Sequence, residues 1–190
     1  MSKIKKIKTD LPGVFILQPT VFEDNRGFFM ESYNKNDLET VGIHFDCVQD
    51  NHSLSIQVGV LRGLHFQLYP KAQTKIVRCL KGVIYDVVVD LRKGSPTYLQ
   101  WRSFILSEYN KLQIFVPKGF AHGVLSLVPN TEIFYKVDEY YSPEYERVIR
   151  WNDPDLNIQW PIETPILSEK DKNAPLLKEI INEINFVYKL

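Results

Sequence analysis

The stretch Thr74–Leu91, TKIVRCLKGVIYDVVVDL, contains two runs of β-branched residues joined at Lys81-Gly82. Such residues favour strands, and a glycine between two apolar runs is typical of a turn. The stretch therefore predicts two consecutive strands, Thr74–Lys81 and Val83–Leu91. Side chains alternate between the two faces of a strand, and in the second strand both faces are largely apolar.

Both faces of this second strand are expected to be buried. One face carries Val83, Tyr85, Val87, Val89 and Leu91, and the other carries Ile84, Asp86, Val88 and Asp90. Antiparallel sheets with one face in water do not show this pattern. We expect one face to fill a barrel and the other to meet a second layer. A contact with another subunit is a natural candidate for that layer, so we expect a homodimer; the alternative is a central strand of a sandwich covered by helix.

Strands also dominate the rest of the chain. Aromatic residues make up 13% of the sequence, Val and Ile are frequent, and turn-forming residues separate short apolar runs. This pattern favours an all-β sandwich or barrel over alternating strands and helices. The further predicted strands are 14–18, 28–33, 47–55, 60–67, 101–106, 112–116, 124–127 and 132–140.

Two segments are expected to be helical. Residues 35–41 form a short helix that ends at Gly42. Residues 176–188 repeat apolar side chains, among them Leu177, Ile180 and Ile184, at helical spacing. This second helix is expected to lie against the outside of the β-body. Residues 151–167, rich in Pro, Asp and Asn, are expected to be irregular.

Length, charge and cysteine content narrow the class of protein. A chain of 190 residues is most simply one domain, residues 1–190. It has 23 basic and 23 acidic residues, and this neutral balance disfavours a nucleic-acid binder. Cys47 and Cys79 are too few for a disulfide framework and fit a reduced compartment. Without a secretory or membrane-length apolar segment, we expect a soluble, cytoplasmic protein.

Several polar residues interrupt strands that are otherwise apolar. Arg62 and His65 lie in VLRGLHFQ, and Lys75 and Tyr135 lie in two other predicted strands. Such groups are costly to bury unless they face water or a ligand. We therefore expect an anionic ligand in the mouth of the barrel; the alternative is that each residue lies on an exposed edge strand. Arg62 and His65 should point in opposite directions unless Gly63 hosts a bend or bulge.

A metal site is not predicted. Small β-barrels that bind a metal typically present a His-x-His pair, but Gln67 follows His65 at that spacing and Val124 follows His122. Two histidines without a clear third ligand fall short of a two-histidine, one-carboxylate site. The phosphate-binding, dinucleotide-binding and serine-hydrolase motifs are absent too.

Six segments, in order over residues 10–175, carry a family resemblance. They are FEDNRGFFME (22–31), QDNHS (49–53), VLRGLHFQ (60–67), VIYDVVVDLR (83–92), PKGFAHG (117–123) and LSEKD (167–171). Together they resemble the dTDP-4-dehydrorhamnose 3,5-epimerase family, for which Arg-Gly-Leu-His-x-Gln with a downstream Phe-Ala-His-Gly is a specific combination. Val124 departs from the family, which more often has Phe there, and we expect this to affect packing more than chemistry.

The resemblance implies a fold, an activity and four catalytic residues. The family is a dimeric, cofactor-free jelly roll of the cupin type that inverts C3 and C5 of a dTDP-linked 4-keto-6-deoxyhexose, on the route to dTDP-L-rhamnose. By this resemblance His65 is the general base and Asp171 is its orienting partner. Tyr135 is the acid on the opposite face of the sugar, and Lys75 lies beside the C4 oxygen.

The resemblance also implies a set of substrate-binding residues. The positions that match substrate contacts are Arg26, Glu31, Gln49, Asn51, Arg62, His122, Glu146 and Lys170. Phe29 and Tyr141 resemble the aromatic pair that stacks the thymine, with Phe29 donated by a second subunit. The implied partner is a small nucleotide sugar, with neither nucleic acid nor membrane.

Three alternatives remain open at this point. An enzyme that inverts only C3 or only C5 of a related 4-keto sugar could share all these motifs. A non-catalytic sugar-nucleotide-binding barrel would not require a base and an opposed acid, so His65, Tyr135 and Lys75 together disfavour it. A metal-dependent cupin oxygenase is disfavoured by the small number of candidate ligands.

Overall fold

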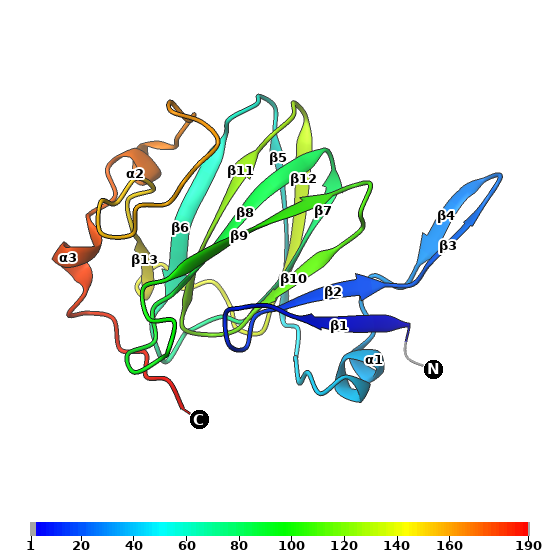
Figure 1. Ribbon diagram of the computed structural model, residues 1–190, viewed down its shortest axis with the longest axis horizontal. Coiled ribbons are helices and arrows are strands. Elements are labelled where there is room, and N and C mark those ends of the chain that lie inside the picture. Colours follow the sequence, from blue (N-terminus) through cyan, green and yellow to red (C-terminus); the bar gives the residue numbers. More distant parts are fainter. Residues whose placement is uncertain (1–2, 190) are drawn as a thin grey trace.

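Two antiparallel sheets face each other in the computed structural model, which describes residues 3–189 (Figure 1). The six-stranded sheet has the order β1 (Ile4–Lys8), β2 (Phe15–Pro19), β10 (Gln113–Val116), β7 (Lys75–Lys81), β12 (Thr131–Val137), β5 (Gln49–Ser55). The five-stranded sheet has the order β13 (Glu146–Val148), β6 (Leu61–Gln67), β11 (Phe120–Ser126), β8 (Val83–Asp90), β9 (Trp101–Ser107). This arrangement confirms the expected all-β, cupin-like jelly roll.

One apolar cluster packs between the two sheets. From the five-stranded sheet, β8 contributes Ile84 and Val88, and from the opposite sheet β7 contributes Val77 and Cys79. Alternation along β8 therefore directs this face into the barrel, as the sequence predicts.

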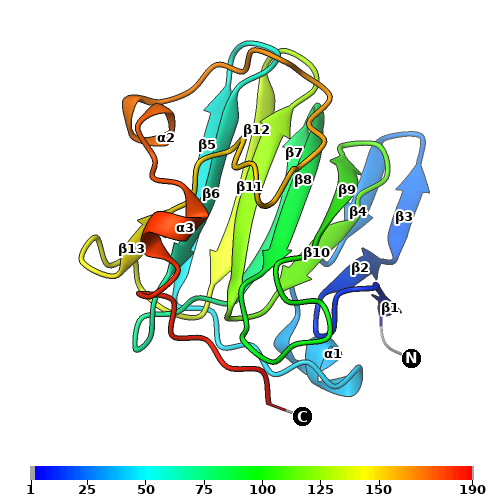
Figure 2. The same ribbon diagram turned by 60° about the vertical axis from the view of Figure 1, so that its left-hand side comes forward.

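The opposite face of β8 is covered by the C-terminal part of the same chain. Val87, Val89 and Leu91 pack in a second cluster with Leu177 and Phe186, among others. The second layer is thus intramolecular, so this face of β8 does not itself require a second subunit, and the homodimer stays a prediction. The irregular segment 151–167 joins this layer and carries no strand or helix, as expected. Figure 2 shows the layer against the five-stranded sheet.

The expected helix over 176–188 is largely wrong. Only α3 (Leu177–Ile180) is helical, and the chain after it turns and runs on without helix. Ile184 and Phe186 are nevertheless buried, and Val187 forms a parallel bridge with Lys93. The apolar residues reach the sheet from extended chain, so a helical period was not needed to bury them.

The short helix α1 (Lys35–Thr40) confirms the other helical prediction. The Asn34 side chain caps it by accepting hydrogen bonds from the backbone N–H groups of Asn36 and Asp37. Leu38 packs with Phe45 and Phe115 on the outer face of the six-stranded sheet. Both outer faces of the barrel are therefore at least partly covered.

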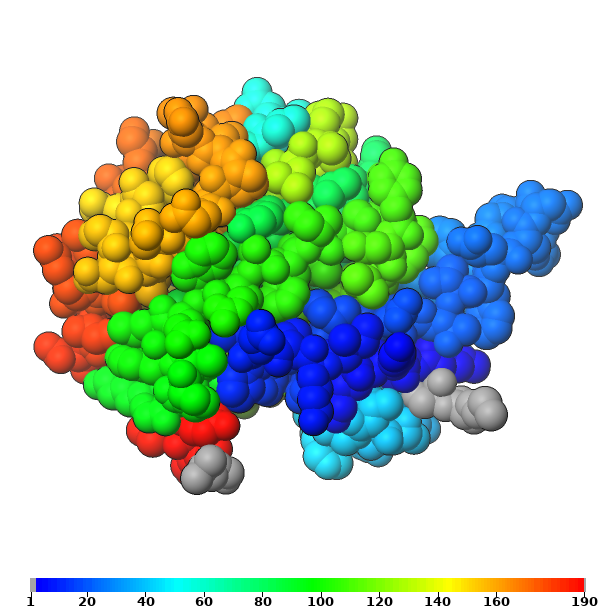
Figure 3. Space-filling view, in the orientation of Figure 1, coloured from blue at the N-terminus to red at the C-terminus, as the bar shows by residue number. Residues whose placement is uncertain are grey.

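A hairpin projects from the body of the molecule. It consists of β3 (Val21–Asp24) and β4 (Gly27–Met30), which pair only with each other. Figures 1 and 3 show it standing clear of the two sheets. Phe22, Phe28 and Phe29 on it are 50%, 52% and 65% exposed. Such aromatic exposure is typical of a surface that meets another molecule.

No helix among residues 3–189 has the length and apolar character needed to cross a membrane.

Candidate active site

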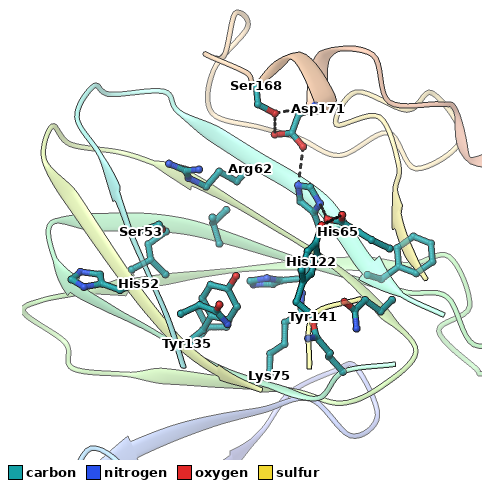
Figure 4. A pocket seen from close by; sticks show the side chains of 18 residues that line it. His52, Ser53, Arg62, His65, Lys75, His122, Tyr135, Tyr141, Ser168 and Asp171 are labelled. Carbon is teal, nitrogen blue, oxygen red and sulfur yellow. Dashed lines mark hydrogen bonds and ion pairs between the residues drawn. The ribbon is translucent and has the colours of Figure 1, made fainter. Parts of the chain in front are cut away.

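A cavity of about 410 Å³ opens between the two sheets. Nine of the candidate residues line it: Asn51, Arg62, His65, Lys75, His122, Tyr135, Tyr141, Glu146 and Asp171. All four residues expected to be catalytic are in this group. Figure 4 shows the labelled side chains approaching the cavity from different walls.

The six-stranded sheet directs Tyr135 and Lys75 into the cavity. Tyr135 on β12 pairs with Val77 on β7, and Lys75 lies two residues before Val77. Residues two apart on a strand share a face, so the phenol and the ammonium group leave the sheet on the same side. On the other neighbour, β5, Asn51 pairs with Tyr135.

The five-stranded sheet supplies His65 and Arg62 through a bulge. His65 pairs with His122 on β11, whereas Arg62 pairs with Val124, so β6 has one more residue than β11 over this interval. Gly63 adopts φ +142°, and a Cβ there would lie 2.5 Å from Gly123 Cα. Only glycine fits so close an approach. The irregularity at Gly63 therefore lets both side chains line one cavity, the exception that the sequence analysis allowed.

Asp171 contacts one ring nitrogen of His65. Its Oδ1 lies 2.8 Å from Nε2, which is the distance of an ion pair. Within residues 3–189, Oδ1 accepts no hydrogen bond of good geometry. Asp171 lies on α2 (Glu169–Lys172), where its Oδ2 accepts a 2.7 Å hydrogen bond from the hydroxyl of Ser168, the N-cap residue. Burial opposes ionisation of Asp171, but the contact with His65 and the hydrogen bond from Ser168 outweigh it, so the pKa of Asp171 is lowered.

Glu146 contacts the other ring nitrogen of His65. Glu146 pairs with Gln67, two residues from His65, and its Oε1 lies 3.2 Å from Nδ1. Tyr141 donates a 2.8 Å hydrogen bond to Oε2, and Lys170 forms an ion pair with the same oxygen. Bonding to His65, aided by Lys170 and Tyr141 against the effect of burial, lowers the pKa of Glu146 to about 2.

The charged and phenolic groups of the cavity are strongly perturbed. Burial lowers the pKa of Lys75 to about 8, although the charges of Asp86 and Glu146 act in the opposite direction. Burial raises the pKa of Tyr135, which therefore stays protonated at neutral pH. Burial alone would lower the pKa of His65, but Asp171 and Glu146 more than offset it, and the pKa is raised.

Asp86 is a functional candidate that the sequence analysis missed. It is fully buried on β8, and its Oδ2 lies 2.8 Å from His122 Nε2. Its Oδ1 has no hydrogen-bond partner among the described residues. A carboxylate on an apolar strand face is the same kind of signal that singled out Lys75, so the pattern could have identified it.

Two candidate residues lie beside the cavity and support it. Gln49 accepts a 3.0 Å hydrogen bond from the backbone N–H of Tyr141 and donates one of 2.8 Å to Asn51. Lys170 reaches the cavity through its ion pair with Glu146. Neither side chain lines the cavity itself.

Three candidate residues do not reach the cavity of their own chain. Arg26 and Phe29 lie on the projecting hairpin, where Arg26 pairs with Asp24. Glu31, just after the hairpin, forms an ion pair with Lys3. Their roles as substrate contacts therefore stay predictions, as does the donation of Phe29 by a second subunit.

The cavity has further lining residues that were not predicted. The polar ones are His52, Ser53, Gln67, Gln73 and Ser168. Four of them, His52, Ser53, Gln67 and Ser168, lie within the family-like segments QDNHS, VLRGLHFQ and LSEKD, so closer attention to those segments could have found them. Val124 also lines the cavity, so the departure from the family falls on the wall of the site rather than in remote packing.

No group of three or more His, Cys, Asp or Glu suited to a metal ion occurs within residues 3–189.

The arrangement is suited to moving protons across a bound molecule. An imidazole and a phenol approach the cavity from opposed sheets, and an ammonium group lies on the same sheet as the phenol. A base and an acid on opposite sides can remove a proton from one face of a carbon and return one to the other.

Comparison with known proteins identifies the family. The family model for dTDP-4-dehydrorhamnose 3,5-epimerase matches residues 8–179. This chain belongs to the dTDP-4-dehydrorhamnose 3,5-epimerase family. The Shigella flexneri protein of that name is 52% identical over 169 residues, which cover 88% of this chain and 93% of the relative.

Solved structures of family members share the fold. The Bacillus anthracis dTDP-4-dehydrorhamnose 3,5-epimerase, solved with TDP and PPi bound, is 55% identical with a TM-score of 0.90, covering 92% of this chain and 99% of its own. A Legionella pneumophila 3,5-epimerase in complex with dTDP-4-keto-L-rhamnose is 45% identical with a TM-score of 0.92, covering 98% and 100%. A 3'-monoepimerase from Streptomyces bikiniensis, in complex with dTDP-quinovose, is 31% identical with a TM-score of 0.86, covering 93% and 90%.

Proposed function

We propose that this chain is an isomerase that inverts C3 and C5 of a dTDP-4-keto-6-deoxyhexose, on the route to dTDP-L-rhamnose. The observation that carries the proposal is the cavity lined by His65, Tyr135 and Lys75 from two opposed sheets. Identity near 50% to 3,5-epimerases supports the same reaction. The proposal treats residues 1–190 as a single epimerase domain.

The chemistry follows from the acidity of carbons next to a ketone. Removal of a proton from C3 or C5 leaves an enolate with its charge on the C4 oxygen. His65 takes that proton, and Asp171 orients the ring and stabilises the imidazolium that forms. Tyr135 returns a proton from the opposite face, which inverts the carbon. No electrons leave the sugar overall, so the reaction requires no redox cofactor.

Lys75 stabilises the enolate in this mechanism. An ammonium group about 4 Å from the oxyanion gains roughly 4 kcal/mol at an effective dielectric constant near 20. That corresponds to about a thousandfold in rate. A neutral hydrogen bond contributes only about 1 kcal/mol, so the charge of Lys75 matters more than its ability to donate.

The remaining candidate residues bind the nucleotide. Arg62 fits the diphosphate because a guanidinium group pairs with two phosphate oxygens at once. Asn51, His122, Tyr141 and Glu146 contact the rest of the ligand from the cavity walls, with Tyr141 stacking on the thymine. Gln49 and Lys170 hold these groups in place.

We further propose a homodimer in which the hairpin of one subunit covers the cavity of the other. The exposed aromatic rings of the hairpin support this, as does the position of Arg26, Phe29 and Glu31 away from their own cavity. In the dimer Phe29 stacks on the thymine bound by the partner. The two cysteines, both free, support a reduced, cytoplasmic location.

Incubation with dTDP-4-keto-6-deoxyglucose in D₂O tests the function directly. Each inversion places a solvent-derived hydrogen on carbon, so NMR or mass spectrometry of the product reports which positions react. Deuterium at both C3 and C5 is the expected result. Deuterium at one position alone would assign the chain to the mono-epimerases, of which a family relative is an example. Binding without deuterium uptake would indicate a non-catalytic sugar-nucleotide-binding protein.

A further inference from the structure

Both ring nitrogens of His65 face a carboxylate. Asp171 Oδ1 lies 2.8 Å from Nε2, and Glu146 Oε1 lies 3.2 Å from Nδ1. A neutral imidazole carries a proton on only one nitrogen, whereas the imidazolium ion carries one on each. Two carboxylates therefore favour the imidazolium ion, which has no free lone pair and cannot accept a proton from a substrate.

The two carboxylates are held very differently. Asp171 is fixed within α2, where the Ser168 hydroxyl donates to its Oδ2 and accepts from its backbone N–H. Its side chain is only 5% exposed. Glu146 lies on the short edge strand β13, lines the cavity and is 15% exposed. The contact of Asp171 with His65 is therefore expected to persist, while Glu146 occupies space that a ligand would enter.

Glu146 already contacts two other side chains besides His65. Its Oε2 accepts from the Tyr141 hydroxyl at 2.8 Å and pairs with the Lys170 ammonium group. A small movement away from His65 would leave the carboxylate charge compensated by these two groups. The cost of separating Glu146 from His65 is therefore reduced.

We propose that Glu146 is a positioning residue that keeps His65 protonated while the cavity is empty and releases Nδ1 when the nucleotide sugar binds. The identity of the ligand rests on the proposed function, whereas the role of Glu146 in the empty protein does not. On release, the Nδ1 proton passes to solvent, and Nδ1 becomes the base while Asp171 retains Nε2. The arrangement confines a competent base to the occupied site.

The charges around His65 agree with this role. Asp171 and Lys170 approach from α2, Glu146 from β13, Lys75 from β7 and His122 from β11. Burial and the charge of Lys75 lower the pKa of His65, and the two carboxylates raise it by more. Since an adjacent opposite charge typically changes a pKa by 1–3, removal of Glu146 alone should let the pKa fall.

An NMR pH titration of the His65 ring in the ligand-free protein tests the proposal. In Glu146→Gln the pKa of His65 should fall by about 1 or more relative to the wild type. Glu132→Gln is the matched control, because Glu132 Oε2 lies 3.0 Å from a different histidine, His52. This control should leave the pKa of His65 unchanged. An unchanged pKa in Glu146→Gln would overturn the proposal.

A second variant separates this role from a merely structural one. Lys170→Met removes the competing cation and should raise the pKa of His65, because the charge of Glu146 is then compensated by the ring and by the Tyr141 hydroxyl only. A fall in the pKa would contradict the proposal even if Glu146→Gln were poorly folded.

Ligand binding and kinetics complete the test. Saturation of the wild type with dTDP-4-keto-6-deoxyglucose should lower the pKa of His65, and the same addition to Glu146→Gln should lower it much less. The pH profile of kcat/KM reports the free enzyme and that of kcat reports the complex. Glu146→Gln should therefore move the acid limb of kcat/KM to lower pH and leave that of kcat in place. If the chain were no epimerase, the titration of the empty protein would still decide the role of Glu146.

Discussion

Tyr135 on β12 and His65 on β6 line one cavity from the two opposed sheets of the barrel. Their strands are not neighbours in either sheet, so the relationship depends on the closure of the whole barrel. A base and an acid placed in this way can act on opposite faces of one sugar ring.

His65→Ala should abolish deuterium uptake from D₂O into the 4-keto sugar. A positioned base typically contributes about 10²–10⁴-fold, and His65 is the imidazole that Asp171 contacts. NMR of the recovered sugar measures the uptake. His44→Ala, at an exposed residue outside the cavity, is the control and should exchange normally. Persistent exchange at both carbons in His65→Ala would remove it as the base.

Tyr135→Phe should reduce epimerisation more than it reduces wash-out of substrate hydrogen. The variant keeps the ring and removes only the acidic hydroxyl, whose raised pKa keeps it protonated at neutral pH. Proton removal by His65 can continue while return from the opposite face fails. Comparison of the rate of deuterium uptake with the rate of product formation checks this. Equal loss of both rates would argue against an acid role.

Activity should decline at alkaline pH as Lys75 loses its proton. The pKa of Lys75 is lowered to about 8, so the stabilising ammonium group is present below that pH and lost above it. Lys75→Met should lower kcat by about a thousandfold, if the charge contributes roughly 4 kcal/mol. The pH profile of kcat gives the measurement, and an alkaline limb retained in Lys75→Met would assign that limb to another group.

Asp86→Asn should move the same alkaline limb to lower pH. The charge of Asp86 raises the pKa of Lys75, so its removal should make the ammonium group easier to deprotonate. Asp50→Asn is a suitable control, because Asp50 pairs with Lys136 on the exposed side of the sheet. An alkaline limb that stays in place in Asp86→Asn would show that Asp86 acts on His122 alone.

Glu146 should contribute to stability at neutral pH and lose that contribution in acid. Its pKa falls from 4.5 when unfolded to about 2 in the folded protein. A lowered pKa means that the contribution is fully present above about 4.5 and is lost as the pH falls through about 2. Urea unfolding at a series of pH values should show wild type and Glu146→Gln converging in this range. A constant difference between them would contradict the assignment.

Mixed dimers should reveal whether the hairpin acts on the other subunit. An Arg26→Ala, Phe29→Ala double variant should bind substrate weakly, and His65→Ala should be inactive. A dimer with one subunit of each kind contains one intact site if the hairpin reaches across, so co-expression should restore about half of the wild-type activity per dimer. No recovery in a purified mixed dimer would indicate that the hairpin serves its own subunit.

The strands that make the barrel could largely be predicted from sequence, and those that depend on distant partners could not. β8 could be predicted because both of its faces are apolar, with Ile84 and Val87 packing in two different layers. β1 was missed because its IKKIK sequence is rich in lysine and lies at a sheet edge. β13 has only three residues, and its pairing with β6 is set by the return of the chain rather than by local pattern.

The residues of the site likewise divide into those that local sequence predicts and those that depend on distant parts of the chain. Lys75 and Tyr135 stood out as polar residues in apolar strands, but nothing local links His65 to Glu146, 81 residues away. The β11 strand begins at Phe120, earlier than the predicted start at residue 124, because Pro117 and Gly119 suggested a longer turn. His122 was therefore assigned a role by resemblance, and its contact with Asp86 became visible only when β11 was paired with β8.

The extra residue at Gly63 determines where the side chains of the site point, while the sheet itself does not depend on it. A regularly paired β6 would still complete its sheet, yet either Arg62 or His65 would then face away from the ligand. Deletion of Gly63 would instead bring Arg62 and His65 to a spacing of two residues, at which a regular strand presents both side chains on one face without a bulge.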